Sequence, residues 1–334
     1  MNNNMNLREF AEYIRENIKD ALHPSYRDAS VEIKDVEKLN ESYTSLIVRR
    51  PGEEVVPSID LNAEYTRYSY GTSIDVIMWE IADIIEEATP DFDISIMNDY
   101  EKIKDKLFVR LSNEKMNEDL MDKVPHAQKL DMILTYHIAL SQSADRTTSV
   151  MITNGLMENF GVSAARLHVD AVKNSMAKNP MTVMSMEDAL REAFRKDLIS
   201  QGAPKEDIDH ILDVEFPSRD PSGLTVISNT DKQNGASVLF YHEALDQIAE
   251  KLGENFYVLP SSIHELLAVP ESSGMTSVQL DNMVREVNAA EVKKEEVLSD
   301  HCYHYDAKEK LLEHGSQFED RIRRQALEKN AAER

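Results

Sequence analysis

Apolar residues at the start of the chain recur three and four positions apart, which is the spacing of one face of an α-helix. They occupy positions 7, 10, 11, 14, 18 and 22, and His23-Pro24 follows directly. Because a proline disfavours a helical conformation in the residue before it, the helix is expected to end there. The pattern therefore predicts an amphipathic opening helix.

Two runs of alternating apolar and polar residues follow, at residues 31–38 and 43–50. A period of two is typical of strands with one buried face, and the short polar break between the runs predicts a hairpin. Residues 55–61 are interpreted as a third strand. A second helix is expected to begin after Ser73, whose hydroxyl can cap it, and to end before Pro90.

Strand-like runs at residues 106–111 and 130–140 complete a first α+β domain, predicted over residues 1–142. Residues 141–148 are small and polar. This composition suits either a domain boundary or the loop of a hairpin, and the sequence leaves both open.

The second half of the chain has a tighter pattern, centred on the dipeptide Asn234-Gly235, which favours positive φ angles in a hairpin turn. We predict a β-β-α-β-β unit there, with strands at residues 224–228, 236–241, 256–259 and 265–269. The second α+β domain is predicted over residues 143–306, and residues 307–334 as a charged helical tail. The fold class is therefore expected to be α+β, with antiparallel sheets and packed helices.

The charge balance is strongly acidic, with 37 basic and 61 acidic residues giving a formal net charge of −24. This balance argues against direct binding to nucleic acid or to an anionic membrane, both of which attract basic surfaces. Nine acidic residues and no lysine or arginine lie between Tyr68 and Glu101. We interpret this region as a solvated helix face, with a docking surface for a basic protein partner as the alternative. Trp79, the one tryptophan, is assigned to the core.

The N-terminal residues show no apolar stretch of the kind a signal peptide requires, and no run approaches the roughly 20 apolar residues of a membrane helix. The single cysteine, Cys302, cannot form an internal disulfide, which suits a reducing compartment. A cytoplasmic protein is expected. The sequence does not fix its oligomeric state.

The ten glycines exclude the common nucleotide-binding loops, because no two of them are separated by a single residue. Neither a GxGxxG loop, a Walker A loop nor a GxSxG elbow is present. No cofactor is therefore expected. Asp91 and Asp93 form a carboxylate pair in a predicted loop, a pattern too common to indicate a site.

The densest cluster of chemistry-bearing residues is the run from Asp300 to Asp306, which contains His301, Cys302 and His304. These three side chains are weak candidates for metal ligands, with one of the flanking aspartates completing a tetrahedron. Alternation along a strand places His301 on the face opposite Cys302 and His304, so the three would converge only in a loop. The run is interpreted instead as a terminal edge strand with exposed rings.

Several segments resemble an uncharacterised family, described as a domain of unknown function, from anaerobic gut Gram-positive bacteria. The most specific is Phe256-Tyr-Val-Leu-Pro-Ser-Ser-Ile-His-Glu265. The others are residues 56–65, 123–127, 228–237, 283–288, 296–300 and 305–306. The resemblance spans about residues 5–310. A part of it is also similar, more remotely, to a second uncharacterised family from bacilli.

The resemblance implies a bacterial cytosolic protein of the kind often found in accessory or mobile-element gene sets. It implies no activity, cofactor or catalytic residue. Ser261, Ser262, His264 and Glu265 belong to its recognisable segment, whereas the metal-ligand candidates at 301–304 do not belong to the pattern.

Three hypotheses follow, and the first is favoured because no motif fixes a reaction. The protein is a non-catalytic interaction or regulatory factor that acts through acidic surfaces. Alternatively, it is an enzyme in which His264 is the general base and Ser261 or Ser262 the nucleophile or a positioning hydroxyl, with Glu265, Asn234 and Gly235 beside them. The third hypothesis is a nucleic-acid mimic that presents the carboxylates of residues 68–101 to a DNA-binding protein.

Overall fold

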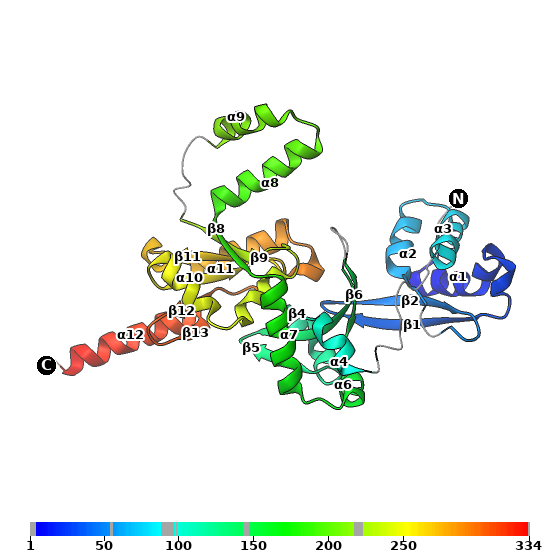
Figure 1. Ribbon diagram of the computed structural model, residues 1–334, viewed down its shortest axis with the longest axis horizontal. Coiled ribbons are helices and arrows are strands. Elements are labelled where there is room, and N and C mark those ends of the chain that lie inside the picture. Colours follow the sequence, from blue (N-terminus) through cyan, green and yellow to red (C-terminus); the bar gives the residue numbers. More distant parts are fainter. Residues whose placement is uncertain are drawn as a thin grey trace. The chain divides into compact units, whose positions relative to one another are not determined.

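The computed structural model describes residues 5–53, 56–87, 97, 99–142, 147–216 and 223–332 (Figure 1). It contains both helices and antiparallel sheets, which confirms the α+β class. Contacts divide the chain into two units. The first comprises residues 1–102 and 140–147, and the second comprises residues 103–139 and 148–334.

This division differs from the predicted domains 1–142, 143–306 and 307–334. The reason is the strand β4 (Leu107–Asn113), which pairs with β6 (Met132–Gln142) and packs against the helix α7 (Ala164–Lys178). Residues before 142 therefore share a core with residues after it. Similarly, the predicted tail adds the strand β13 (Leu311–His314) to the sheet of the second unit.

The first unit is a three-stranded sheet with helices, of which the sequence predicted the first and the last but not the second. Its elements are α1 (Leu7–Ala21), β1 (Ser30–Lys38), β2 (Glu41–Arg49), β3 (Ser58–Asp60), α2 (Leu61–Ser69) and α3 (Ile74–Glu87). The strands pair in the order β1-β2-β3, so the predicted hairpin and third strand are confirmed. Asn6 begins α1 by a reciprocal capping box with Glu9.

The core of the first unit joins α1, α3 and the sheet. Phe10 and Ile14 of α1 and Ile77 and Ile81 of α3 are fully buried in one cluster with Leu46 of β2. Full burial of such a side chain contributes about 1.5–3 kcal/mol to the folded state. The spacing of three and four in both helices is thus the direct cause of their packing.

The second unit begins with a small antiparallel sheet in the order β4-β6-β5, and β7 also pairs with β6. Its further elements are α4 (Tyr100–Ile103), α5 (Glu118–Met121), β5 (His126–Lys129), β7 (Thr147–Met151) and α6 (Asn154–Phe160). β6 and β7 pair with each other, as the hairpin interpretation expects, and the division between the two units also falls at residues 140–147, as the boundary interpretation expects. Ser163 caps α7, because its hydroxyl accepts the main-chain N–H of Arg166.

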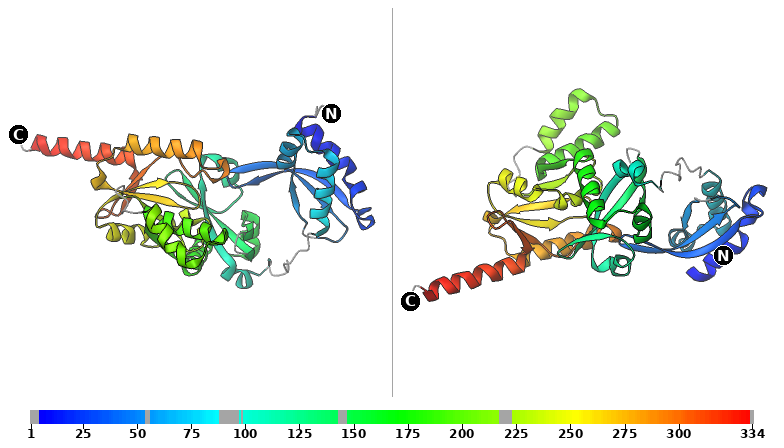
Figure 2. Two further views of the ribbon diagram at one scale, coloured as in Figure 1. Left: turned by 90° about the horizontal axis from the view of Figure 1, so that it is seen from above. Right: turned by 60° about the horizontal axis from the view of Figure 1, so that its bottom comes forward.

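A six-stranded sheet forms the larger part of the second unit, in the order β13-β12-β10-β11-β9-β8, with every pair antiparallel. Its remaining strands are β8 (Met181–Ser185), β9 (Thr225–Asn229), β10 (Phe256–Pro260), β11 (Leu266–Pro270) and β12 (Tyr303–Asp306). The helix α11 (Ser277–Ala290) and the first turns of α12 (Gly315–Ala332) lie on one face of the sheet, and the rest of α12 projects beyond it (Figure 2). Leu280 and Phe318 from these helices pack there with Tyr257, Leu259 and Cys302.

The predicted strand over residues 236–241 is wrong, because residues 235–240 form a 3-10 helix, η5 (Gly235–Phe240). β9 is already paired with β11 on one side and with β8 on the other, so a further strand has no edge to join. The predicted β-β-α-β-β unit is therefore β9, η5, the helix α10 (Ala244–Leu252), β10 and β11. Gly253 ends α10 in the left-handed conformation, as expected of a C-cap.

The prediction for the C-terminal region is also wrong in two respects. β12 lies between β10 and β13 rather than at an edge, and the rings of Tyr303, His304 and Tyr305 are buried. The charged helix begins at Gly315 and not at residue 307, because residues 311–314 pair with β12. None of the described helices is both long and apolar enough to cross a lipid bilayer.

Two helices, α8 (Met186–Ser200) and α9 (Lys205–Glu215), are inserted between the neighbouring strands β8 and β9 (Figure 1). The two strands remain in register up to the pair Ser185 and Thr225, from which the insertion departs. The two helices pack on each other, with Ile208 and Leu212 of α9 buried, while α8 has no buried side chain. The insertion is therefore a helical arm that the sheet does not need for its own pairing.

Candidate functional site

The residues Ser261 to Glu265 form the loop between β10 and β11, and all but Ile263 are partly exposed. The loop is fixed by main-chain hydrogen bonds from Ser262 N to Glu265 O and from Ile263 N to Glu296 O. A further bond from Ala236 N to Ile263 O joins it to η5. The loop is thus held rigidly on both sides.

His264 lies at the centre of this loop and both of its ring nitrogens face protein groups. Nδ1 accepts a hydrogen bond of 3.1 Å from the main-chain N–H of Asn234. The neutral ring therefore carries its proton on Nε2, which lies 3.7 Å from a carboxylate oxygen of Glu296. Burial lowers the pKa of His264, the nearby Arg110 guanidinium lowers it further, and Glu296 opposes them.

The two serines do not direct their hydroxyls at the histidine ring. Ser261 Oγ donates to a carboxylate oxygen of Glu265 at 3.4 Å, and Ser262 Oγ accepts the main-chain N–H of His264 at 3.0 Å. A nucleophilic serine needs a base within hydrogen-bond reach of its hydroxyl, and His264 Nδ1 is already used by Asn234. In this arrangement the four predicted residues stabilise a loop and do not form a nucleophile–base pair.

Gly235 is the closest point between η5 and this loop. A Cβ atom there would lie 2.1 Å from Ser228 Oγ and 2.3 Å from the carbonyl oxygen of His264. Those two atoms are themselves joined by a hydrogen bond of 2.8 Å. Only glycine fits, and the reason is this close approach rather than the positive φ angle that the sequence suggested, which belongs to Asn234.

Arg110 is a member of this cluster that sequence reasoning missed. It comes from β4, and its Nε donates to Asn234 Oδ1 at 3.0 Å. Burial lowers the pKa of its guanidinium. The only signal in the sequence is a charged residue within the apolar run Leu107 to Leu111, and nothing local connects it with Asn234.

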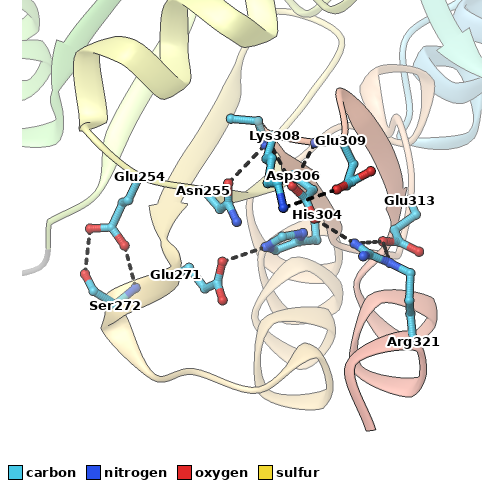
Figure 3. A network of polar contacts seen from close by, with 11 residues as sticks. Glu254, Asn255, Glu271, Ser272, His304, Asp306, Lys308, Glu309, Glu313 and Arg321 are labelled. Atoms are coloured by element: carbon cyan, nitrogen blue, oxygen red, sulfur yellow. Dashed lines mark hydrogen bonds and ion pairs between the residues drawn. The ribbon is translucent and has the colours of Figure 1, made fainter. Parts of the chain in front are cut away.

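The three weak metal-ligand candidates lie in three different surroundings. The His301 ring is 3.7 Å from an oxygen of Asp281, the Cys302 thiol faces the carbonyl of Ser277, and His304 Nε2 is 3.2 Å from Glu271. Figure 3 shows His304 beside Glu271, on the strand that carries Asp306. Within the described ranges, no group of three or more histidine, cysteine or acidic side chains could hold a metal ion.

Cys302 is buried, and its surroundings disfavour the thiolate, which is the reactive form of a cysteine. Burial raises the pKa of its thiol, and the Asp281 carboxylate raises it further. The amide of Cys302 donates to Asp281 at 2.7 Å, and Gly315 lies against the sulfur. These contacts make Cys302 a packing residue between β12, α11 and α12.

A network of charges fixes the first turns of α12 to the sheet (Figure 3). Arg321 binds Asp306 at 3.0 Å and Glu313 at 2.7 Å, and both carboxylates are nearly buried. Burial alone would raise the pKa of Asp306, but the N–H of Glu309 and the Arg321 guanidinium hold it below its usual value.

Replacing Arg321 with methionine is expected to lower the free energy of unfolding by about 2 kcal/mol, because it leaves two buried carboxylates without their cation. Urea unfolding followed by circular dichroism measures this change. Arg323→Met is the matched control, because Arg323 pairs with Asp320 on the exposed side of the same helix. It should change the free energy by less than about 0.5 kcal/mol. Equal losses in the two variants would contradict the structural role of the network.

In the first unit, the outer face of α3 differs from its prediction. Trp79 is 60 % exposed, so its assignment to the core is wrong. The buried positions of α3 are Ile77, Ile81, Ala82 and Ile85, and Trp79 lies on the other side of the helix. The exposed residues around it are Asp75, Val76, Glu80, Asp83, Ile84, Glu86 and Glu87, and with Trp79 we call them the α3 face. The carboxylate pair Asp91 and Asp93 lies outside the described residues.

Comparisons with known proteins give one match. The model of a family of unknown function (DUF5688) matches residues 7–307 of the 334. No curated protein and no solved structure matches.

Proposed function

The chain belongs to the DUF5688 family of unknown function, and on that premise we propose that it is a non-catalytic binding protein whose α3 face docks a basic segment of a protein partner. The observation that carries the proposal is the exposure of Trp79 within this acidic face. Tryptophan is among the side chains that contribute most to protein interfaces, and here it is exposed together with Val76 and Ile84 of the same helix.

The distribution of residues on α3 defines the kind of partner. Val76 and Trp79 lie three residues apart, so they are neighbours on the outer surface of the helix. Asp75 is exposed on one side of them and Glu80 on the other, and Asp83 and Glu87 follow in line with them further along the helix. An apolar strip edged by carboxylates complements an amphipathic segment with apolar residues in its centre and lysine or arginine at its edges.

The same distribution supports a protein partner more than the nucleic-acid mimic. A mimic needs an unbroken array of carboxylates at the spacing of phosphates, and Val76 and Trp79 interrupt the array on α3. Glu80 is moreover paired with Arg67 of α2, which reduces the negative charge at that point. The enzyme alternative is less well supported, because Ser261 donates to Glu265, Ser262 accepts from the main chain of His264, and the His264 Nδ1 is used by Asn234.

We further propose a bacterial cytoplasmic setting. Its supports are the buried free thiol of Cys302, which suits a reducing compartment, and the resemblance of residues 256–265 to the gut Gram-positive family. The accessory or mobile-element context rests on that resemblance alone.

The test uses Trp79 itself, because it is the only tryptophan in the chain and its emission reports solely on the α3 face. The probe is a synthetic amphipathic helix of leucine and lysine, and the control is the same peptide with glutamate in place of lysine. The lysine peptide is expected to shift the emission to shorter wavelength as Trp79 leaves water. The binding should weaken as salt is raised.

Matched variants separate docking from non-specific attraction. Trp79→Ala is expected to weaken binding of a labelled lysine peptide by about 30-fold, as for a central interface residue. Leu327→Ala removes an equally exposed apolar side chain from α12 and should leave binding unchanged. An unshifted emission, or equal binding by the glutamate peptide, would overturn the proposal. Displacement of the lysine peptide only by DNA-binding proteins would favour the mimic.

A further inference from the structure

A second feature lies in the second unit and is independent of the α3 face. A cavity of about 310 Å³ lies where the end of β5, the start of α10 and the strands β12 and β13 meet. Its volume is at the lower end of the range for small-molecule sites. Leu239, Leu245 and Leu312 supply the apolar wall, and the charged residues of the lining are Lys129, Glu243, Asp246 and Lys310.

Lys129 is the unusual member of this lining. Its ammonium donates to the carbonyl of Leu239 at 3.0 Å and lies 4.8 Å from the centre of the Phe240 ring. An ammonium has three N–H donors, so this one hydrogen bond leaves donors for another acceptor. Among the described residues, no carboxylate forms an ion pair with Lys129. A half-buried cation without an anion is costly, and proteins ordinarily provide a partner for it.

Two of the other charges are paired with each other, and the third, Glu243, lies 3.8 Å from a ring nitrogen of His242. Lys310 Nζ lies 2.8 Å from one carboxylate oxygen of Asp246, and the Tyr305 hydroxyl donates to the other at 2.6 Å. Asp246 therefore has both oxygens occupied and does not neutralise Lys129. The chain carries a net charge of −24, and yet no described carboxylate forms an ion pair with Lys129.

Two pKa shifts accompany the partial burial of Lys129. Burial lowers the pKa of the Lys129 ammonium itself. The pKa of His168 is also lowered, first by burial and then by repulsion from Lys129. The first shift is that of a cation partly removed from water, and the second includes the repulsion between this cation and a neighbouring imidazole.

We propose that this cavity binds a small organic anion, with a carboxylate or phosphate group on Lys129 and an apolar body against Leu239, Leu245 and Leu312. The anion supplies the acceptor that the remaining donors of the ammonium lack, and a charge-assisted hydrogen bond of this kind is stronger than a neutral one. The leucine walls favour a compact ring or short chain over a highly polar molecule.

Isothermal titration with benzoate and phenyl phosphate tests this assignment, with benzyl alcohol as the uncharged analogue. At least one of the two anions should bind to the full chain with a dissociation constant below about 1 mM, a value typical of a weak small-ligand site. Benzyl alcohol should bind at least tenfold more weakly. Which anion binds better distinguishes a carboxylate ligand from a phosphate ester.

Variants locate the binding. Lys129→Met keeps the length and apolar stem of the side chain and should weaken binding of the anion at least tenfold. Lys308→Met removes an ammonium whose side chain is 89 % exposed and should have no effect. If Lys129→Met fails to fold, Lys129→Arg retains the charge and should bind within about threefold of the unmodified chain. No binding of either anion at about 10 mM, or equal binding by Lys129→Met, would overturn the proposal.

Discussion

Replacing Gly235 with alanine is expected to lower the free energy of unfolding of the second unit by at least about 3 kcal/mol. The added methyl carbon would lie 2.3 Å from the carbonyl oxygen of His264 and 3.0 Å from the amide nitrogen of Asn229. These are main-chain atoms, which cannot rotate away as a side chain can. The variant must therefore separate η5 from β9 and from the β10–β11 loop, or break the hydrogen bond between Ser228 and His264.

Chemical unfolding followed by circular dichroism measures this loss, and Gly155→Ala is its control. Gly155 lies in α6, and a Cβ atom there would have no heavy atom within 4 Å. Alanine at that position should stabilise the protein by about 0.5–1 kcal/mol, because glycine loses more freedom when a helix forms. A change of less than about 1 kcal/mol for Gly235→Ala would show that the contact is looser than described.

The protein is expected to lose stability as the pH falls from about 6.5 to 5, and His137 should be a principal cause. His137 is fully buried, and burial together with the Arg110 guanidinium holds its pKa well below its usual value. Between the folded and unfolded pKa values, the unfolded chain binds a proton that the folded chain does not. Protonation therefore favours unfolding, by up to about 1.4 kcal/mol for each pH unit.

The measurement is the free energy of unfolding as a function of pH in this window, which lies above the usual titration range of carboxylates. His137→Gln stays neutral and can keep the hydrogen bond to the Thr135 hydroxyl, so its slope with pH should be shallower than that of the unmodified chain. It should not vanish, because the pKa values of His168, His264 and His304 are also lowered. His242→Gln, at an exposed position, should leave the slope unchanged. Equal slopes for all three proteins would contradict the role of His137.

Most of the first unit could be predicted from the sequence, because its contacts follow local periodicity, but the short helix α2 was missed. The spacing of three and four predicts α1 and α3, and the alternation predicts β1 and β2, in each case from the residues of that element alone. The same rule failed for Trp79, which the apolar pattern of α3 assigned to the core although it lies on the exposed side of the helix. Hydrophobic character alone does not separate a core residue from an exposed apolar one.

The second unit was harder to predict because its decisive contacts join distant parts of the chain. Residues 236–241 alternate like a strand, but both edges of β9 are occupied by strands far away in sequence, and nothing local shows this. In the same way, Ser299 and Tyr303 donate to Asp131, almost 170 residues earlier. The compact run Ser261 to Glu265 was visible in the sequence, whereas its partners Arg110 and Glu296 were not.

The insertion of α8 and α9 between two paired strands has a consequence for how the sequence can change in evolution. Ser185 and Thr225 are the last paired residues of β8 and β9 before the inserted helices. The register of the two strands therefore does not depend on the length of the insertion. Closing a loop twice as long costs only about 0.6 kcal/mol more. Relatives could therefore shorten, lengthen or replace the arm without disturbing the sheet, and the arm is the part of the second unit best placed to acquire new recognition while the sheet stays the same.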